Sequence, residues 1–213
     1  MKKIISATLL AALSLFSVTA VQAQDAKKIM QDVSSKYGKL KSLKGDFVLK
    51  YTTASGKANE SVKGNLALKG SKYKVTLKGQ EIITDAKSIW TYNKSANEVQ
   101  IDKYNANSSF SPAKLFSGSY DKEYNYKLAG ETTYNGKPSY TIELTPKAAG
   151  GFSKINLYVD KSRKSIVGGK VFEKTGNVIE YTVNSLVENP AIADSEFTFD
   201  TKKHPGVEVI DLR

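Results

Sequence analysis

Apolar and polar side chains alternate in the stretch Lys72-Tyr73-Lys74-Val75-Thr76-Leu77-Lys78. A period of two is the pattern of a β-strand with one buried and one solvated face. The same alternation recurs in about ten short stretches after residue 42, and turn-forming residues separate them. One of these turns is Asn135-Gly136, a pair typical of tight hairpins. The pattern predicts a mainly β protein with a meandering antiparallel sheet.

The sheet needs a partner, because a wide flat sheet would leave one apolar face in water. A helix is expected before the first strand. Asp25 can cap it, and one apolar stripe recurs at steps of four, four and three: Ile29, Val33, Tyr37 and Leu40. No βαβ alternation, internal repeat or linker is visible. We therefore expect a single domain over residues 24–213.

The first 23 residues are typical of a signal peptide. Lys2 and Lys3 precede an apolar stretch over residues 4–21, and Val21-Gln22-Ala23 supplies the small residues that a signal peptidase recognises. The pattern predicts cleavage after Ala23 and a periplasmic protein. A membrane anchor is the alternative, but the stretch is short and rich in Ala, Ser and Thr. The chain has no Cys, so the signal cannot mature into a lipid-anchored form.

The composition excludes several kinds of active site. The 213 residues contain no Cys and one His, which rules out thiolate nucleophiles and Cys-based metal sites and disfavours His-based proton relays. Near pairs of carboxylates occur, as at Asp121 and Glu123, but none has a second catalytic group beside it. His204 precedes a proline in a predicted loop. We expect no enzyme, no catalytic or metal-binding residues and no cofactor, although a secreted hydrolase such as a glycosidase is a further alternative.

The positive charge of the chain is spread along the predicted strands. There are 32 Lys and Arg residues against 21 Asp and Glu, but Arg163 and Arg213 are the only arginines. No Gly-rich phosphate loop or aromatic RNA-binding motif accompanies the lysines, so nucleic acid is not an expected partner. An anionic membrane surface or an acidic protein would suit this charge. A solvated sheet face protected from aggregation is an equal alternative.

One long connection interrupts the alternation, over residues 105–118. Ser111 followed by Pro112 predicts the start of a helix, and Gly118 predicts its end. The segment carries three large apolar side chains, Phe110, Leu115 and Phe116. We expect it to form a lid over the open side of the sheet. A fixed plug at one end of the sheet is the alternative.

Several motifs occur in the order found in LolA-type periplasmic lipoprotein carriers. The stretch over residues 80–93, with Asp85 in a turn before Trp90-Thr91-Tyr92, resembles a segment of that family. Residues 43–47 resemble its first strand. The remaining matches are Ser111-Pro112 with Leu115, then Leu144-Thr145-Pro146-Lys147, then Phe197-Thr198-Phe199 with Pro205-Gly206-Val207-Glu208-Val209. The resemblance covers nearly the whole chain after the signal.

The resemblance implies a fold and a task. The fold would be an incomplete, half-open antiparallel β-barrel whose apolar hollow is covered by a helical lid. The protein would be a monomer that takes acylated lipoproteins from an inner-membrane ABC-type exporter to an outer-membrane receptor or membrane surface. Physical chemistry agrees with this task. Burial of each CH₂ group away from water is favourable by about 0.8 kcal/mol, so exposing an acyl chain of ~16 carbons to water costs on the order of 10 kcal/mol. A periplasmic module that senses lipids or lipoproteins and regulates another protein is the alternative.

Ten residues on the alternating strands are the predicted lining of a lipid-binding cavity, and Phe110, Leu115 and Phe116 are its predicted lid. The lining is Phe47, Leu49, Tyr51, Leu66, Leu68, Tyr73, Val75, Leu77, Trp90 and Tyr92. Any one of them, taken alone, is more typical of an ordinary core, and only the whole set together with the resemblance favours a cavity. One departure from the family is evident. Many members have an Arg, tied to closure of the lid, in the stretch that here reads Lys69-Gly70-Ser71-Lys72.

Overall fold

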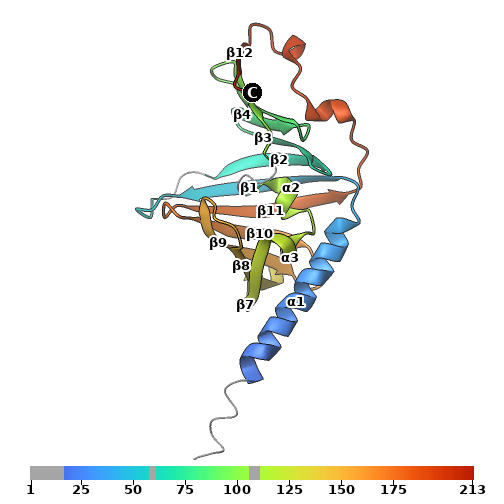
Figure 1. Ribbon diagram of the computed structural model, residues 1–213, viewed down its shortest axis with the longest axis vertical. Coiled ribbons are helices and arrows are strands. Elements are labelled where there is room, and N and C mark those ends of the chain that lie inside the picture. The colour runs from blue at the N-terminus through green and yellow to red at the C-terminus, as the bar shows by residue number, and fades with distance from the viewer. Residues whose placement is uncertain (1–16, 58–60, 106–110) are drawn as a thin grey trace, which may run out of the picture.

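In the part of the chain that the computed structural model describes, residues 17–57, 61–105 and 111–213, twelve strands form one open sheet (Figure 1). The first meander is β1 (Leu43–Thr52), β2 (Val62–Lys69), β3 (Lys72–Leu77), β4 (Gln80–Thr84), β5 (Ser88–Asn93) and β6 (Glu98–Lys103). The second is β7 (Tyr124–Tyr134), β8 (Lys137–Pro146), β9 (Phe152–Asp160), β10 (Ile166–Glu173) and β11 (Val178–Glu188). The prediction of a mainly β, unclosed antiparallel sheet is confirmed.

The two meanders join at the centre of the sheet, where β11 pairs with β1. Each runs outward from this junction, so β7 forms one edge and β6 lies near the other. The last strand, β12 (Glu208–Asp211), adds to β6 in parallel. This parallel pair differs from the predicted meander, because residues 189–207 cross the sheet before β12 pairs. Two short 3₁₀ helices, η1 (Asp194–Phe197) and η2 (Thr201–Lys203), lie in that crossing.

Two of the predicted local signals are visible in the backbone. Asn135 and Gly136 join β7 to β8 with φ values of 49° and 73°, the left-handed pair that a tight hairpin needs. The helix α2 (Pro112–Leu115) begins where expected, because the Ser111 side chain accepts a hydrogen bond from the Lys114 amide. A second short helix, α3 (Tyr120–Glu123), follows it.

The long helix α1 (Ser17–Gly38) begins earlier than expected. Asp25 lies within it and is not its N-cap, so that prediction is wrong. The helix continues upstream because no proline or glycine interrupts residues 17–25. From Asp25 onward its apolar stripe is buried against the sheet, and the buried residues are Ala26, Ile29, Met30, Val33 and Tyr37.

One side of the sheet packs against α1 and α2. On the other side, β2, β3 and β5 contact residues 189–207. The inner face is the helix side, and its main cluster includes Leu66, Leu68, Tyr73 and Val75. The outer face carries Ala67, which packs with Ile192 and Phe197 of the C-terminal crossing. Figure 1 shows α1, α2 and α3 on one side and the crossing at the opposite end of the sheet. Both faces are therefore partly covered.

Candidate functional site

Seven of the ten predicted lining residues share the inner face with α1. They lie in the main apolar cluster or pack directly against it, and they are Phe47, Leu49, Leu66, Leu68, Tyr73, Val75 and Leu77. The strand register explains this, since Leu66 is opposite Val75 and Leu68 is opposite Tyr73. Tyr51 is on the same side of β1 as Phe47 and Leu49 and pairs with Ile179 of β11. The strands thus bring eight of the ten residues to one face.

Trp90 and Tyr92 point to the other side of the sheet, so their placement with the other eight is wrong. Ile82 of β4 is on the inner face with its partner Val75, and Ile82 pairs with Thr91 of β5. Trp90 and Tyr92 flank Thr91 and must therefore face outward. Tyr92 packs there against Phe199 and His204, with ring centroids 5.1 and 4.5 Å away. Alternation within a strand does not specify which set faces the helices.

The inner face is covered at one end and open at the other. Leu43, Leu66 and Leu68 lie beneath the helices and are 1 to 7 % exposed. Phe47, Leu49, Tyr51 and Leu77, further along the same strands, are only half-buried. Val62, opposite Leu49, is 37 % exposed. This gradient leaves an apolar surface next to the buried core, where a chain of methylenes can add its own contact area.

The lid segment, residues 111–118, rests on α1 and the sheet through apolar contacts. Leu115 and Phe116 are both 7 % exposed, and the Phe116 ring meets the Tyr37 ring edge-on at 5.1 Å. Phe110, the third predicted lid residue, lies outside the described residues. In the described part of the chain, the hydrogen bonds of α2 stay within residues 111–120, including one from the Tyr120 hydroxyl to the Leu115 carbonyl, and Lys114 pairs with Glu123 of α3 at 3.2 Å. Among the described residues, the contacts that hold this segment on α1 and the sheet are apolar and therefore non-directional.

A glycine allows the lid segment to approach α1 closely. Gly118 has a φ of 70°, and a Cβ at this position would lie 2.6 Å from the Ser34 carbonyl oxygen. The same atom would be 3.1 Å from the Gly38 nitrogen. Beside this contact is a pocket of about 260 Å³ between the end of α1, α2 and the β2–β3 turn. Leu43, Leu68 and Phe116 are among its apolar walls.

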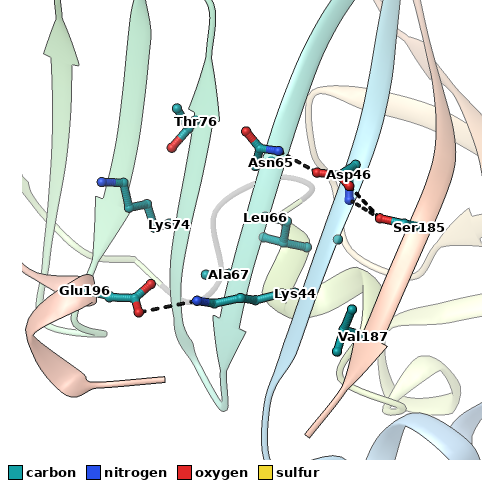
Figure 2. Close-up of a pocket in the computed structure, with 11 residues that line it drawn as sticks. Lys44, Asp46, Asn65, Leu66, Ala67, Lys74, Thr76, Ser185, Val187 and Glu196 are labelled. Atoms are coloured by element: carbon teal, nitrogen blue, oxygen red, sulfur yellow. Dashed lines mark hydrogen bonds and ion pairs between the residues drawn. The ribbon is translucent and has the colours of Figure 1, made fainter. Parts of the chain in front are cut away.

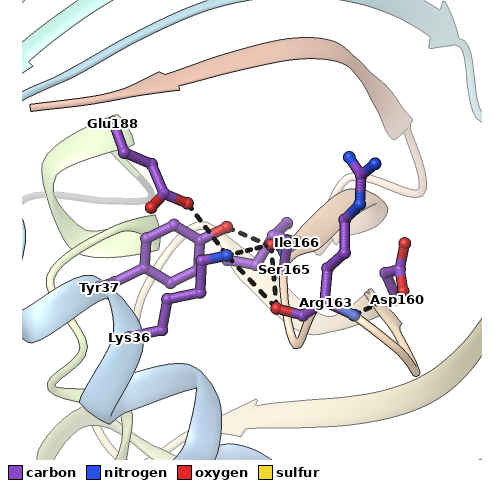
Figure 3. Close-up of polar contacts among 7 residues, drawn as sticks. All are labelled: Lys36, Tyr37, Asp160, Arg163, Ser165, Ile166 and Glu188. Carbon is purple, nitrogen blue, oxygen red and sulfur yellow. Dashed lines mark hydrogen bonds and ion pairs between the residues drawn. The ribbon is translucent and has the colours of Figure 1, made fainter. Parts of the chain in front are cut away.

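Polar contacts anchor the C-terminal end of α1 to the sheet (Figure 3). The Lys36 Nζ lies 3.0 Å from Glu188 and donates a hydrogen bond to the Ser165 hydroxyl at 2.7 Å. The Ile166 amide donates to the Tyr37 hydroxyl at 2.9 Å. Burial raises the pKa of Tyr37 to about 12, so this hydroxyl is neutral at ordinary pH. The helix is held by directional bonds, whereas the contacts described between the lid segment and α1 are apolar.

A different pocket, of about 330 Å³, lies on the outer face (Figure 2). Its polar side chains bind one another. Asn65 and Ser185 donate hydrogen bonds to Asp46, and Lys44 lies 3.4 Å from Glu196. These hydrogen bonds, the Ser185 bond first, lower the pKa of the Asp46 carboxyl. An acyl chain in this pocket would remove water from its charged side chains, which costs free energy. The inner face is therefore the better apolar site.

In the stretch that departs from the family motif, Gly70 and Ser71 line the pocket beside the lid segment, whereas the two lysines face the outer side. Lys69 and Lys72, on either side of the β2–β3 turn, lie 2.8 and 3.2 Å from the Asp194 carboxylate. Their charges hold the C-terminal crossing and do not reach the lid segment. The sequence alone did not identify Tyr37 as a lid contact or Gly118 as a close approach to α1. The Tyr37 contact and the Gly118 approach both depend on packing between segments about 80 residues apart. The periodicity of apolar residues does not predict such long-range packing.

The described residues do not form a metal site or a membrane-spanning helix. No group of three or more His, Asp or Glu side chains within the described ranges is placed to hold a metal ion. None of the helices described is long and apolar enough to cross a membrane.

Known proteins are similar to this chain in sequence or in fold. A protein from Methylobacillus flagellatus named outer-membrane lipoprotein carrier protein is 29% identical over 123 residues, covering 56% of this chain and 57% of its own. The chain thus spans little more than half of that relative. A protein of the same name from Pectobacterium carotovorum is 28% identical over 205 residues, with 92% of each chain covered.

Among solved structures, an uncharacterized conserved protein from Thermus thermophilus has a TM-score of 0.58 at 13% identity, covering 88% of this chain and 99% of that one. This likeness concerns the fold alone. The family model described as "Outer membrane lipoprotein carrier protein LolA" matches residues 38–200, which include β1 to β11 and the lid segment. The chain therefore belongs to the LolA family of outer membrane lipoprotein carrier proteins.

Proposed function

We propose that this protein is a non-enzymatic periplasmic carrier that shields the acyl chains of lipoproteins on the inner face of its sheet. It would receive them from an inner-membrane ABC-type exporter and deliver them to the outer membrane, through a receptor or directly to the membrane surface. The observation that carries the proposal is the one-sided apolar face, which is buried under α1 and α2 at one end and half-exposed at the other. Family membership supports the same task.

The lid segment has the properties that a carrier needs. Its contacts with α1 and the sheet are apolar, so an entering acyl chain can replace them with contacts of the same kind. The free energy needed to open the lid segment is then small, so the cargo can also leave. The anchor at Lys36 and Tyr37 would keep α1 in place while the lid segment moves.

The proposal includes removal of residues 1–23 by cleavage after Ala23. The α1 side chains that the structure describes begin at Asp25. The buried ones among them are Ala26, Ile29, Met30, Val33 and Tyr37, and the cleaved protein would keep all of them. Cleavage would shorten the helix by the part that precedes Gln24. N-terminal sequencing of the protein from a periplasmic fraction should begin at Gln24, and retention of Met1 in membranes would refute this part of the proposal.

Binding of a fluorescent fatty acid to two charge variants on β1 tests the proposed site. Leu49→Glu places a carboxylate on the inner face and should weaken binding by at least about tenfold, since the charge has no partner there. Val48→Glu is the matched control. Val48 is also half-buried, but it faces outward and is opposite Lys63, which can pair with the new carboxylate. Equal binding by both variants, each folded by circular dichroism, would contradict the proposed site.

A further inference from the structure

Two apolar side chains meet over a glycine in the middle of the inner face. Phe47 of β1 and Leu77 of β3 are both opposite Gly64 of β2. A Cβ at Gly64 would lie 2.5 Å from Cζ of the Phe47 ring and 2.7 Å from Cδ2 of Leu77. The absence of a side chain at Gly64 therefore lets the ring of Phe47 and the end of Leu77 lie across β2.

This row coincides with the change in burial along the strands. The next row toward the helices contains Leu66 and Val75, which are 7 and 8 % exposed. In the other direction lie Leu49 and Val62, which are half-buried and 37 % exposed. Phe47 and Leu77 thus separate the helix-covered part of the inner face from its open part.

We propose that Phe47 and Leu77 form a barrier that sets how far an acyl chain can enter along the inner face, and thereby the chain length that the protein prefers. The inference rests on the proposed function, because it assigns a specificity role within that site. A chain that enters from the open end contacts Leu49 and Val62 first and meets the Phe47 ring next. Each methylene buried before the barrier adds about fourfold in affinity, whereas methylenes beyond the available length add none.

The test measures the affinity of the whole protein for a series of saturated fatty acids from decanoate to stearate. Affinity for the parent protein should rise with chain length and then level off. In Phe47→Ala, affinity should continue to rise past that length, by about fourfold for each methylene that enters the vacated space. Leu77→Ala opens the barrier from the other side and should shift the profile in the same direction. This second variant keeps the test valid if Phe47→Ala does not fold.

Leu49→Ala is the matched control, because Leu49 is on the same strand and face but outside the barrier. Its affinity should fall at every chain length while the levelling point stays unchanged. If the parent binds fatty acids and the barrier variants level off where it does, the barrier is refuted and the carrier function stands. If the parent binds none of the series, both the function and the barrier are refuted.

Discussion

Tyr37 connects three parts of the molecule through one side chain. It lies on α1, its ring contacts Phe116 of the lid segment, and its hydroxyl accepts a hydrogen bond from the Ile166 amide at the start of β10. The residue is 2 % exposed, so water does not replace these contacts easily. The ring and the hydroxyl therefore perform separable tasks.

Replacing Tyr37 with Phe should separate the role of the hydroxyl from the role of the ring. The buried Ile166 amide would lose its acceptor, which costs about 1–3 kcal/mol in the free energy of unfolding. The ring contact with Phe116 would remain, so fatty-acid binding should change little. Urea unfolding beside a binding titration measures both quantities. Unchanged stability would show that the hydroxyl is not the anchor described here.

At the level of single residues, the sequence predicted which side chains alternate but not always which side they face. Eight of the predicted lining residues lie on one face, because the register of β1, β2 and β3 places their inner-face residues side by side. Trp90 and Tyr92 were assigned to the wrong face. Their true side is also apolar, since Phe197 and Phe199 cover it from a segment about 100 residues away. Hydrophobicity therefore did not distinguish the two sides of β5.

The lid segment is the element whose position depends most on one backbone contact. Its start was predictable, because Ser111 and Pro112 form a local signal that needs no tertiary partner. The packing of the segment on α1 was not predictable, because it depends on the close contact of Gly118 with Ser34 and Gly38. The sequence suggested only that Gly118 ends a helix.

Gly118→Ala should displace the lid segment from α1. The new methyl group would collide with the Ser34 carbonyl, and the positive φ adds strain, so we expect a loss of about 1 kcal/mol or more. Binding of a dye that reports exposed apolar surface should rise in the absence of cargo. Gly136→Ala is the control, because its φ is 73° and nothing lies within 4 Å of its Cβ position. Equal dye binding by the two variants would show that the Gly118 contact does not hold the lid.

The whole molecule is organised around the junction of β1 with β11, which joins two meanders that are distant in sequence. The sequence predicted the strands and the open antiparallel sheet from alternation and turn chemistry. It did not predict the parallel pairing of β12 with β6, because this pair depends on the path of residues 189–207 over the outer face. Long-range order of this kind has no local signature.

Stability of the whole molecule should fall in alkaline solution. Burial, as the leading cause, raises the pKa of Tyr37, Tyr73, Tyr124 and Tyr134 from 10.0 to about 12. These groups hold their protons more tightly in the folded state, so their stabilising contribution is complete below pH 10 and is lost as the pH rises toward 12. Urea unfolding at a series of pH values should show a declining free energy above about pH 10. A constant value to pH 11.5 or so would contradict the burial of these tyrosines.

Photo-crosslinking of a fatty acid with a photoreactive group in its chain tests the central claim most directly, because mass spectrometry can assign each label to a residue. We predict labels on inner-face residues such as Phe47, Leu49 and Leu77, and their loss when an excess of unlabelled fatty acid competes. Labels confined to the outer-face pocket near Lys44 and Glu196, or labels that no competitor removes, would contradict the account.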